Sequence, residues 1–383
     1  MAVLDPTARP PRPGSRNWLG VDVAEGWSCA VAGRRARGTG PTVRSGPPAD
    51  DRTPVAASLP AHTGFVRRLR APFSSFAKAE KVWPSLLDIE LPFPLDSAVY
   101  YFLPPTRTAD GQVETLAIAA RRTDVEAWQG RLQGEGFTPW RLDHEALALW
   151  SGSTAEQPLA APVGRLVCYL GVDRTALAWG CGPELRAASG LRTGLRELSE
   201  PGRDEAARRA WSQRVIQFLR AQGGDASAPR QWAWCGPGAA RPDLLSTLSA
   251  GLDLSAATTV FTHRDPETFL ARAVGARAAR PDRSACDLLP EDRLPPARRN
   301  QLRRQARRAP LILAAAALLL IGVNVGWTTW LDLRRERAQT ALRTLAVDLA
   351  GAPHVPRGQE VLVTQRALQE QEADFQPFRA AFA

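Results

Sequence analysis

The sequence predicts an α/β chain of two lobes, followed by one membrane-spanning helix and a short helical end. Three observations support this prediction. Strand-like and helix-like segments alternate over residues 18–150, the same kind of pattern starts again over 163–280, and the run Leu311–Trp330 carries no charge. The 383 residues allow two or three domains, and the part that precedes the apolar run is long enough to bury a substantial core.

The first lobe is predicted over residues 18–150, after a Pro- and Arg-rich stretch, 1–17, that we expect to be a disordered tail. Two β-prone runs flank Glu25-Gly26 and predict a hairpin, whereas the Gly, Pro, Arg and Ser of 33–60 predict that part of this stretch is a mobile loop. Helical spacing predicts a helix over Val66–Leu91. A strand pair, a helix with Thr123 as its N-cap, a strand and a short helix should follow, at Ala98–Leu103, Glu114–Ala120, Arg122–Gln133, Thr138–Asp143 and His144–Trp150.

The second lobe is predicted over residues 163–280, after a linker, Ser151–Pro162, that is rich in Ser, Gly, Ala and Pro. Three β-prone runs, a long helix, a buried strand and a further helix are expected at Gly164–Gly171, Thr175–Cys181, Glu184–Gly190, Arg203–Gln222, Gln231–Cys235 and Leu244–Leu252. The similar openings of the two lobes suggest an internal duplication, although the residues themselves show no obvious repeat.

The apolar run sets the predicted organisation of the chain. As a helix, Leu311–Trp330 would span about 30 Å, the thickness of a bilayer core, with Trp327 and Trp330 where an aromatic belt lies. We therefore predict a transmembrane helix over 309–330 and a basic juxtamembrane linker over 281–308. Six arginines precede the helix and favour a cytoplasmic N-terminal part and anionic lipid contact: Arg298, Arg299, Arg303, Arg304, Arg307 and Arg308. The alternative is a buried core helix of a large soluble protein.

The last segment, 331–383, is predicted to be a periplasmic helical or coiled-coil segment. Its apolar residues lie on an approximate heptad ladder: Leu331, Ala338, Leu342, Leu345 and Leu349. The ladder predicts a helix that continues out of the bilayer and pairs with a second helix over 331–350, in a homodimer or a heterodimer. The alternative is an amphipathic helix that packs on its own domain. Pro353 and Pro356 should end the helix.

Composition argues against several functions. The net charge is +10, and arginine supplies 47 of the 49 basic residues across the whole chain, a pattern that indicates genome composition more than selection for nucleic acid. The five cysteines form no CxxC pair and are expected to be reduced packing residues, so no metal site is predicted. The motifs GxxxxGK[ST], GxSxG and HExxH are absent, and the four histidines are dispersed.

Three turns remain as candidate chemistry. Gly20-Val21-Asp22-Val23 opens the first lobe, Leu170-Gly171-Val172-Asp173 opens the second, and Gly236-Pro237-Gly238 lies late in the second. Backbone N–H groups in such turns can hold phosphate, and an adjacent acid can position hydrated Mg²⁺. The candidate cofactor-binding residues are therefore Asp22, Gly171, Gly236 and Gly238; no cofactor is predicted, and Mg-ATP is the alternative.

The order of these motifs resembles the actin-like (ribonuclease H-like) proteins of bacterial type IV pilus and type II secretion platforms, the PilM and GspL families. Further shared features are the Leu91-Pro92-Phe93-Pro94 turn, Gly136–Leu149 and the closing helix Phe269–Gly275. The segment Asp287–Pro290, followed by arginines and one membrane helix, resembles the start of the PilN family. One chain that carries both parts has the GspL arrangement.

Two departures bear on what the resemblance implies. Tyr169 stands where an ATP-binding relative would have an acid ahead of Gly171, and Ala24 replaces the usual second glycine of the first loop. Because a phenol cannot hold Mg²⁺-bound water as a carboxylate does, weak or lost nucleotide binding is expected and no catalytic residue is assigned.

The resemblance implies a non-catalytic scaffold of the bacterial inner membrane, single-pass with its N-terminus in the cytoplasm. It would link a motor ATPase to inner-membrane platform proteins and periplasmic components of a secretion or pilus machine. Two alternatives stay open: an actin-fold ATPase that uses Asp22, the Gly171 turn and Gly236–Gly238, and a basic, soluble nucleic-acid-binding protein.

Overall fold

The computed structural model of the chain describes residues 17–34, 42–44, 53–108, 110–160, 163–200, 202, 204–222, 230–252, 258–279, 286–290, 292, 294, 296–350 and 358–381. The chain divides into two compact units, Met1–Gln301, which we call the body, and Leu302–Ala383, the distal unit. Most of the predicted tail and of the stretch 33–60, together with Pro353 and Pro356, lies outside the described residues.

The first sheet of the body is the core of the predicted first lobe, and its strand order is β3-β2-β1-β4-β9. These strands are β1 (Asn17–Ala24), β2 (Trp27–Arg34), β3 (Thr42–Arg44), β4 (Val55–Leu59) and β9 (Pro139–His144). The predicted β1–β2 hairpin is confirmed. Strands β3 and β4 lie within 33–60, the stretch of which part is predicted to be a mobile loop, and neither strand was predicted. Strand β4 is buried throughout and pairs in parallel with β1 and β9, so its short sequence shows no alternation that could reveal it.

A smaller sheet, β5-β8-β6, is inserted between β4 and β9, and β7 also pairs with β8. Its elements are β5 (Gly64–Ala71), α1 (Phe76–Glu90), the 3-10 turn η1 (Leu95–Ser97), β6 (Ala98–Phe102), β7 (Thr106–Arg107) and β8 (Val113–Arg121). The helix predicted over Val66–Leu91 is therefore wrong in its first part. In β5, Leu69 is buried between exposed Arg68 and Arg70, which is the period of a strand.

Helices α2 (Arg122–Gly134) and α3 (Glu145–Glu156) flank β9. The N-cap of α2 is Arg121 and not the predicted Thr123, which lies in the first turn. Helix α3 extends six residues beyond the predicted end at Trp150, into the stretch predicted as a linker. That extension is helical because Ser153 is buried and bonded to Arg165 and His263, contacts that composition does not reveal.

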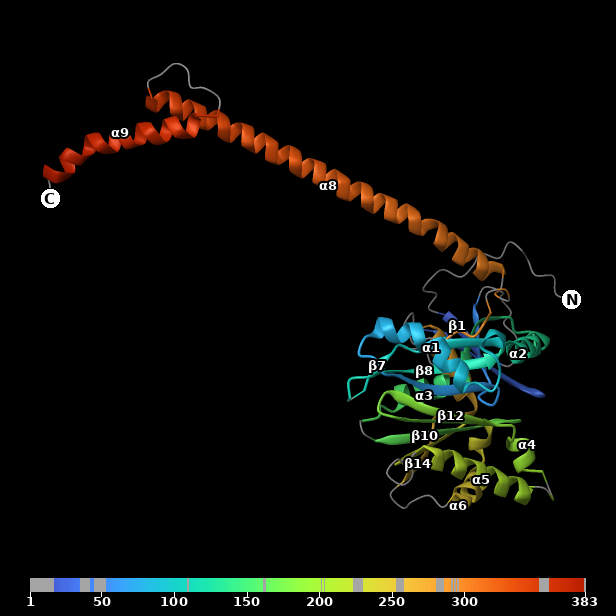
Figure 1. Ribbon diagram of the computed structural model, residues 1–383. Helices are drawn as coiled ribbons and strands as arrows, with labels where there is room; N and C mark the ends of the chain where they lie inside the picture. The colour runs from blue at the N-terminus through green and yellow to red at the C-terminus, as the bar shows by residue number, and fades with distance from the viewer. Residues whose placement is uncertain are drawn as a thin grey trace. The chain divides into compact units, whose positions relative to one another are not determined.

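The second sheet has the order β12-β11-β10-β13-β14, and its pairing directions repeat those of the first sheet. It consists of β10 (Gly164–Leu170), β11 (Thr175–Cys181), β12 (Glu184–Leu191), β13 (Gln231–Cys235) and β14 (Thr259–Thr262), with the 3-10 turns η3 (Pro237–Ala240) and η4 (Pro266–Thr268). Helices α4 (Leu195–Leu198), α5 (Asp204–Ala221) and α6 (Pro242–Gly251) cover one face (Figure 1). The suggested duplication is thus visible in the topology.

Helix α7 (Phe269–Ala278) follows the second sheet in sequence but packs on the first, against β1, β2, β4 and α3. A Cβ at Gly20 would lie 1.9 Å from the Ala271 carbonyl oxygen, so only glycine allows this approach of β1 to α7. At the other end of α7, Arg277 Nε lies 2.5 Å from Asp143 Oδ2 on β9. Residues 18–150 therefore do not complete their own core, because α7 supplies one side of it.

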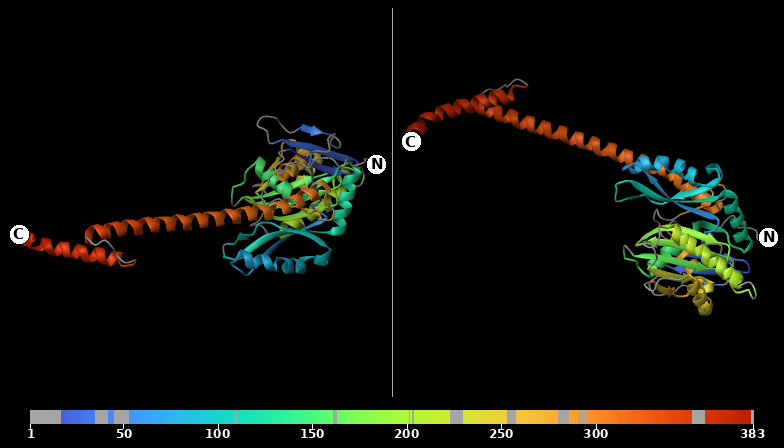
Figure 2. Two further views of the ribbon diagram at one scale, coloured as in Figure 1. Left: turned by 90° about the horizontal axis from the view of Figure 1, so that it is seen from above. Right: turned by 60° about the horizontal axis from the view of Figure 1, so that its bottom comes forward.

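The distal unit is helical. Helix α8 (Pro296–Ala350) is continuous over 55 residues, and α9 is Glu360–Ala381 (Figure 2). Within the described residues, α8 contains one stretch, Ala314–Leu345, that is long and apolar enough to cross a membrane, and none of its apolar window is buried. The predicted continuation of the helix past Trp330 is confirmed, and the arginine-rich run before the predicted span is helical from Pro296.

Candidate functional site

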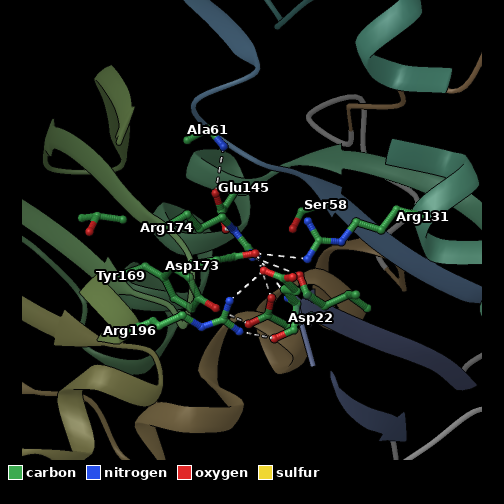
Figure 3. A network of polar contacts seen from close by, with 12 residues as sticks. Asp22, Ser58, Ala61, Arg131, Glu145, Tyr169, Asp173, Arg174 and Arg196 are labelled. Atoms are coloured by element: carbon green, nitrogen blue, oxygen red, sulfur yellow. Dashed lines mark hydrogen bonds and ion pairs between the residues drawn. The ribbon is translucent and has the colours of Figure 1, made fainter. Parts of the chain in front are cut away.

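Two of the three predicted turns, those at Asp22 and at Gly171, meet in one buried network of charges (Figure 3). Asp22 lies near the end of β1, and Tyr169 is the second-last residue of β10. Residues Gly171 to Arg174 form the turn from β10 to β11, which places Arg174 opposite Asp22. The network therefore joins the first sheet to the second.

Both carboxylate oxygens of Asp22 are bonded to the protein itself. The Tyr169 hydroxyl donates to Oδ2, and Arg174 Nη2 lies 2.7 Å from Oδ1. The Asp22 residue is 2% exposed. Burial raises the pKa of Asp22, although the Arg174 charge and the Tyr169 hydroxyl act to lower it.

Arg174 is the centre of the network. Its Nε lies 2.9 Å from Glu145 Oε1, and its Nη1 lies 3.0 Å from the Val23 carbonyl oxygen and 3.2 Å from Asp173 Oδ1. Glu145 Oε2 in turn accepts from the Ala61 N–H at 2.8 Å. Burial alone would lower the pKa of Arg174, but the negative charges of Glu145 and Asp22 and the Tyr169 oxygen hold it well above its usual value. The guanidinium is therefore permanently charged and matched by acids.

The rim of the network is partly exposed. Asp173 Oδ2 accepts from Arg131 Nη2 of α2 at 3.1 Å and from the Glu25 N–H at 3.3 Å. Arg196 of α4 bonds to the Glu25 carboxylate at 2.7 Å and to its carbonyl oxygen at 3.0 Å. Burial acts to raise the pKa of Asp173, but Arg174, the Glu25 N–H and Arg131 together hold it below its usual value. These contacts close the β1–β2 turn over the turn from β10.

The glycines predicted to hold phosphate are used within the fold. The Gly171 N–H donates to the Arg174 carbonyl oxygen at 2.8 Å, and the Gly236 N–H donates to the Pro266 carbonyl oxygen at 2.8 Å. Gly236 has a φ of 93°, a conformation that favours glycine, and Gly238 lies against the Leu170 side chain. At Gly171 and Gly236 the N–H groups thus do not converge on a free anion position.

These residues do not fit the Mg-nucleotide that the resemblance suggested as an alternative. A carboxylate that positions Mg²⁺ through water needs an oxygen that the water can reach, but the Asp22 side chain is fully buried and its oxygens face Tyr169 and Arg174. The Arg174 guanidinium supplies a fixed positive charge where a metal ion would have to enter. Among the described residues, no group of three or more His, Cys, Asp or Glu side chains is arranged to hold a metal.

A second feature lies at the β9 edge of the first sheet. The segment Cys286–Pro290, which we call the strap, runs beside β9: the Leu288 N–H donates to the Leu142 carbonyl oxygen at 2.7 Å, and Asp287 Oδ1 accepts from the Leu142 N–H at 3.2 Å. The Cys286 and Leu288 side chains are fully buried. Arg298, in the first turn of α8, bonds to Asp287 Oδ2 and to the Trp140 carbonyl oxygen. The strap thereby fixes the start of α8 to the body.

Comparison with known proteins supports the predicted fold. No protein-family model matches the chain, and no curated protein matches its sequence. A chain of the PilM-PilN type IV pilus biogenesis complex matches with 18% identity and a TM-score of 0.53, over 70% of this chain and 100% of that chain. The fold is therefore the predicted actin-like one. The cytoplasmic domain of EpsL, an inner membrane component of the Vibrio cholerae type II secretion system, matches at 13% identity and a TM-score of 0.44, over 72% and 98% of the two chains.

Within this actin-like body, sequence reasoning found some members of the network and missed others. Asp22 and the Gly171 turn lie together, and Tyr169, predicted as a departure, is the residue that bonds Asp22. Arg174 and Glu145 were missed. One sequence signal was available for Arg174, since it follows Asp173 directly in the second turn, but nothing local indicates that it reaches Asp22.

The remaining predicted residues lie on α8. Trp327 and Trp330 are exposed and stacked, with ring centroids 5.1 Å apart. Of the six arginines, Arg298 and Arg299 bond to the strap region, at Asp287 and the Asp292 carbonyl oxygen respectively. The other four lie in the helix, and their side chains are outside the described part of the structure, as is that of Leu311: Arg303, Arg304, Arg307 and Arg308.

Proposed function

We propose that the chain is a non-catalytic inner-membrane scaffold of a type II secretion or type IV pilus machine. In this proposal the body lies in the cytoplasm and binds a motor ATPase, and α8 crosses the membrane to platform and periplasmic components. The observation that carries the non-catalytic part is the pairing of Asp22 with Arg174 at 2.7 Å, which replaces a ligand by an internal ion pair. The likeness to a pilus biogenesis complex supports the choice of machine.

The scaffold role is supported by how the chain is joined. The strap is bonded to β9, Arg298 bonds to the strap, and α8 continues from Pro296 to Ala350 without interruption. A flexible tether would need none of these contacts, whereas a coupling element needs a fixed start and a stiff helix. A force on α8 would thus reach the core sheet of the body directly.

The proposal is tested by titrating the full-length protein in detergent with Mg-ATP in a calorimeter, alongside Asp22→Ala. We expect no heat of binding from the wild type, because the network leaves the nucleotide no carboxylate. Heat from the wild type that disappears in Asp22→Ala would favour the actin-fold ATPase instead.

The membrane and partner parts need their own measurements. Membranes from cells that make the full-length protein should retain it after washes with high salt and with alkaline carbonate. Affinity purification from the native cell should recover a motor ATPase with it. A protein released by the salt wash would contradict the membrane part, and salt-sensitive binding to DNA or RNA would favour the basic nucleic-acid binder.

A further inference from the structure

The uncharged run Leu311–Trp330 of α8 contains one strongly polar side chain, Asn324. It lies six residues before Trp330, or about 9 Å inside the aromatic end of the span. A carboxamide in hydrocarbon has no water to bond with, and leaving its donor and acceptor unpaired is costly. The short side chain also cannot reach the headgroup region as lysine or arginine does.

The other polar side chains nearby meet this requirement within their own helix. The Thr328 hydroxyl donates to the Asn324 and Val325 carbonyl oxygens at 3.1 and 2.9 Å, and the Thr329 hydroxyl donates to the Val325 carbonyl oxygen at 2.6 Å. The Asn324 carboxamide has no such bond within the described chain. It is therefore the one group in this stretch that calls for a second helix.

The position of Asn324 indicates which face of α8 meets that helix. Residues at intervals of seven run from the membrane stretch into the segment beyond it: Ala317, Asn324, Leu331, Ala338 and Leu345. Because a seven-residue repeat keeps one side of a helix turned toward a partner, these residues form one seam, and α8 is unbroken along all of it (Figure 2). Gly322 and Gly326, each two residues from Asn324, lie on the opposite side, each about 160° around the helix from it.

We propose that this seam binds the same seam of a second copy of the chain in a parallel pair, with the two Asn324 carboxamides hydrogen-bonded to each other inside the membrane. A carboxamide carries both a donor and an acceptor, so it is complementary to itself when two identical helices lie in register. Two copies inserted with the same orientation are necessarily parallel. The inference rests on the membrane anchor of the proposed function.

Cysteine cross-linking of the full-length protein in its own membranes tests the pair. Leu331→Cys lies on the seam, and Leu333→Cys is a matched control on the other side, since the two leucines are 41% and 50% exposed. After mild oxidation, Leu331→Cys should give a disulfide-linked species of about twice the monomer mass, with at least about fivefold less from Leu333→Cys. The parent protein, with its native cysteines only, sets the background.

Three further changes are made in the Leu331→Cys protein at limiting expression. Asn324→Leu should weaken association about tenfold, a loss in the range measured for interhelical polar bonds in membranes. Asn324→Gln should retain most of the cross-link, because it keeps the amide, and Gly326→Leu should leave it unchanged.

Several results would overturn the inference. Equal cross-linking at positions 331 and 333, no loss with Asn324→Leu, or loss with Gly326→Leu in place of Asn324→Leu would each do so. A cross-linked product whose mass shows a different protein would also overturn it, because the partner of the seam would then be another membrane helix and not a second copy of the chain. Carbonate extraction of the same samples separates the two proposals: membrane-retained protein without seam cross-links refutes the pair alone, and released protein refutes the anchor and the pair together.

Discussion

The body buries charged groups in pairs, whereas helix α8 exposes large apolar side chains. In the body, the charges of Asp22, Glu145 and Arg174 are taken out of water and satisfied by one another. In α8, large apolar side chains such as Leu318 and Ile321 are 69% and 60% exposed, and the Asn324 carboxamide has no hydrogen bond among the described residues. In the proposed arrangement α8 lies in a bilayer and pairs with a second helix, whereas the buried charges of the body are paired within the chain. This difference predicts which substitutions act within the chain and which act through its surroundings.

The largest expected effect is at the centre of the network. Arg174→Ala would leave Asp22 and Glu145 buried without a counter-charge, which should cost about 3–5 kcal/mol of unfolding free energy. Urea denaturation of the full-length protein in detergent, followed by tryptophan fluorescence, measures this change. The control is Arg196→Ala, which removes an exposed pair with Glu25 and should cost under about 1 kcal/mol. Equal effects of the two changes would show that the body does not depend on this buried pairing.

The next effect tests the helix. Ile321→Arg would place a charge in the apolar stretch and should oppose insertion by about 3 kcal/mol, so that part of the protein leaves the membrane fraction. Ile89→Arg, on α1 of the body, replaces a side chain that is 80% exposed and should change nothing. Carbonate extraction of both variants gives the comparison. Full retention of Ile321→Arg would contradict the assignment of α8 as a membrane span.

Lowering the pH should destabilise the body but leave helix α8 formed. Burial lowers the pKa of His144 to about 4, from an ordinary value near 6.5, and His62 and His263 are lowered to about 4 as well. Because the unfolded chain takes up these protons first, the stability present above pH 6.5 is lost as the pH falls toward 4. The loss should be about 1.4 kcal/mol per pH unit for the fully buried His144.

Urea midpoints at several pH values measure how steeply the free energy of unfolding falls with pH. His144→Leu should reduce this slope by the contribution of one proton. The helical signal of α8 should persist at acid pH, since its apolar stretch contains no histidine. A slope that His144→Leu leaves unaltered would assign the acid sensitivity to other groups.

The smallest effect concerns the strap that joins the two regions. Asp287→Ala removes the acceptor for the Leu142 N–H and the partner of Arg298, at a cost of about 1–2 kcal/mol. The lost contacts let only the strap and the start of α8 detach from β9, and the rest of the body stays folded. Limited proteolysis near Arg298 should therefore speed up about tenfold with little change in global stability. Asp292→Ala, which removes an exposed pair with Arg122, is the control. If both variants were cut at the same rate as the wild type, α8 would not be held by Asp287.

The elements that the sequence predicted well are those with a strong local signal. The hairpin at Glu25-Gly26, the helix over Arg203–Gln222 and the uncharged run Leu311–Trp330 each show in a short window, through turn residues, helical spacing or absence of charge. Strand β4 was not predicted, and strand β5 was predicted as part of a helix, for the converse reason. A strand buried on both faces has no alternation, and the arginines of β5 fit a helix as well as a strand.

The sequence by itself determined the class of the protein: an α/β body with Asp22 and the Gly171 turn at corresponding positions of two lobes, and one helix suited to a membrane. Tertiary structure alone decided what the site contains. Arg174 reaches Asp22 across 152 positions of sequence, Glu145 reaches Arg174 across 29, and α7 returns to cover the first sheet. Periodicity reports which face of a segment is apolar, but it says nothing of which distant charge will meet a buried carboxylate, because that pairing depends on how the two sheets pack.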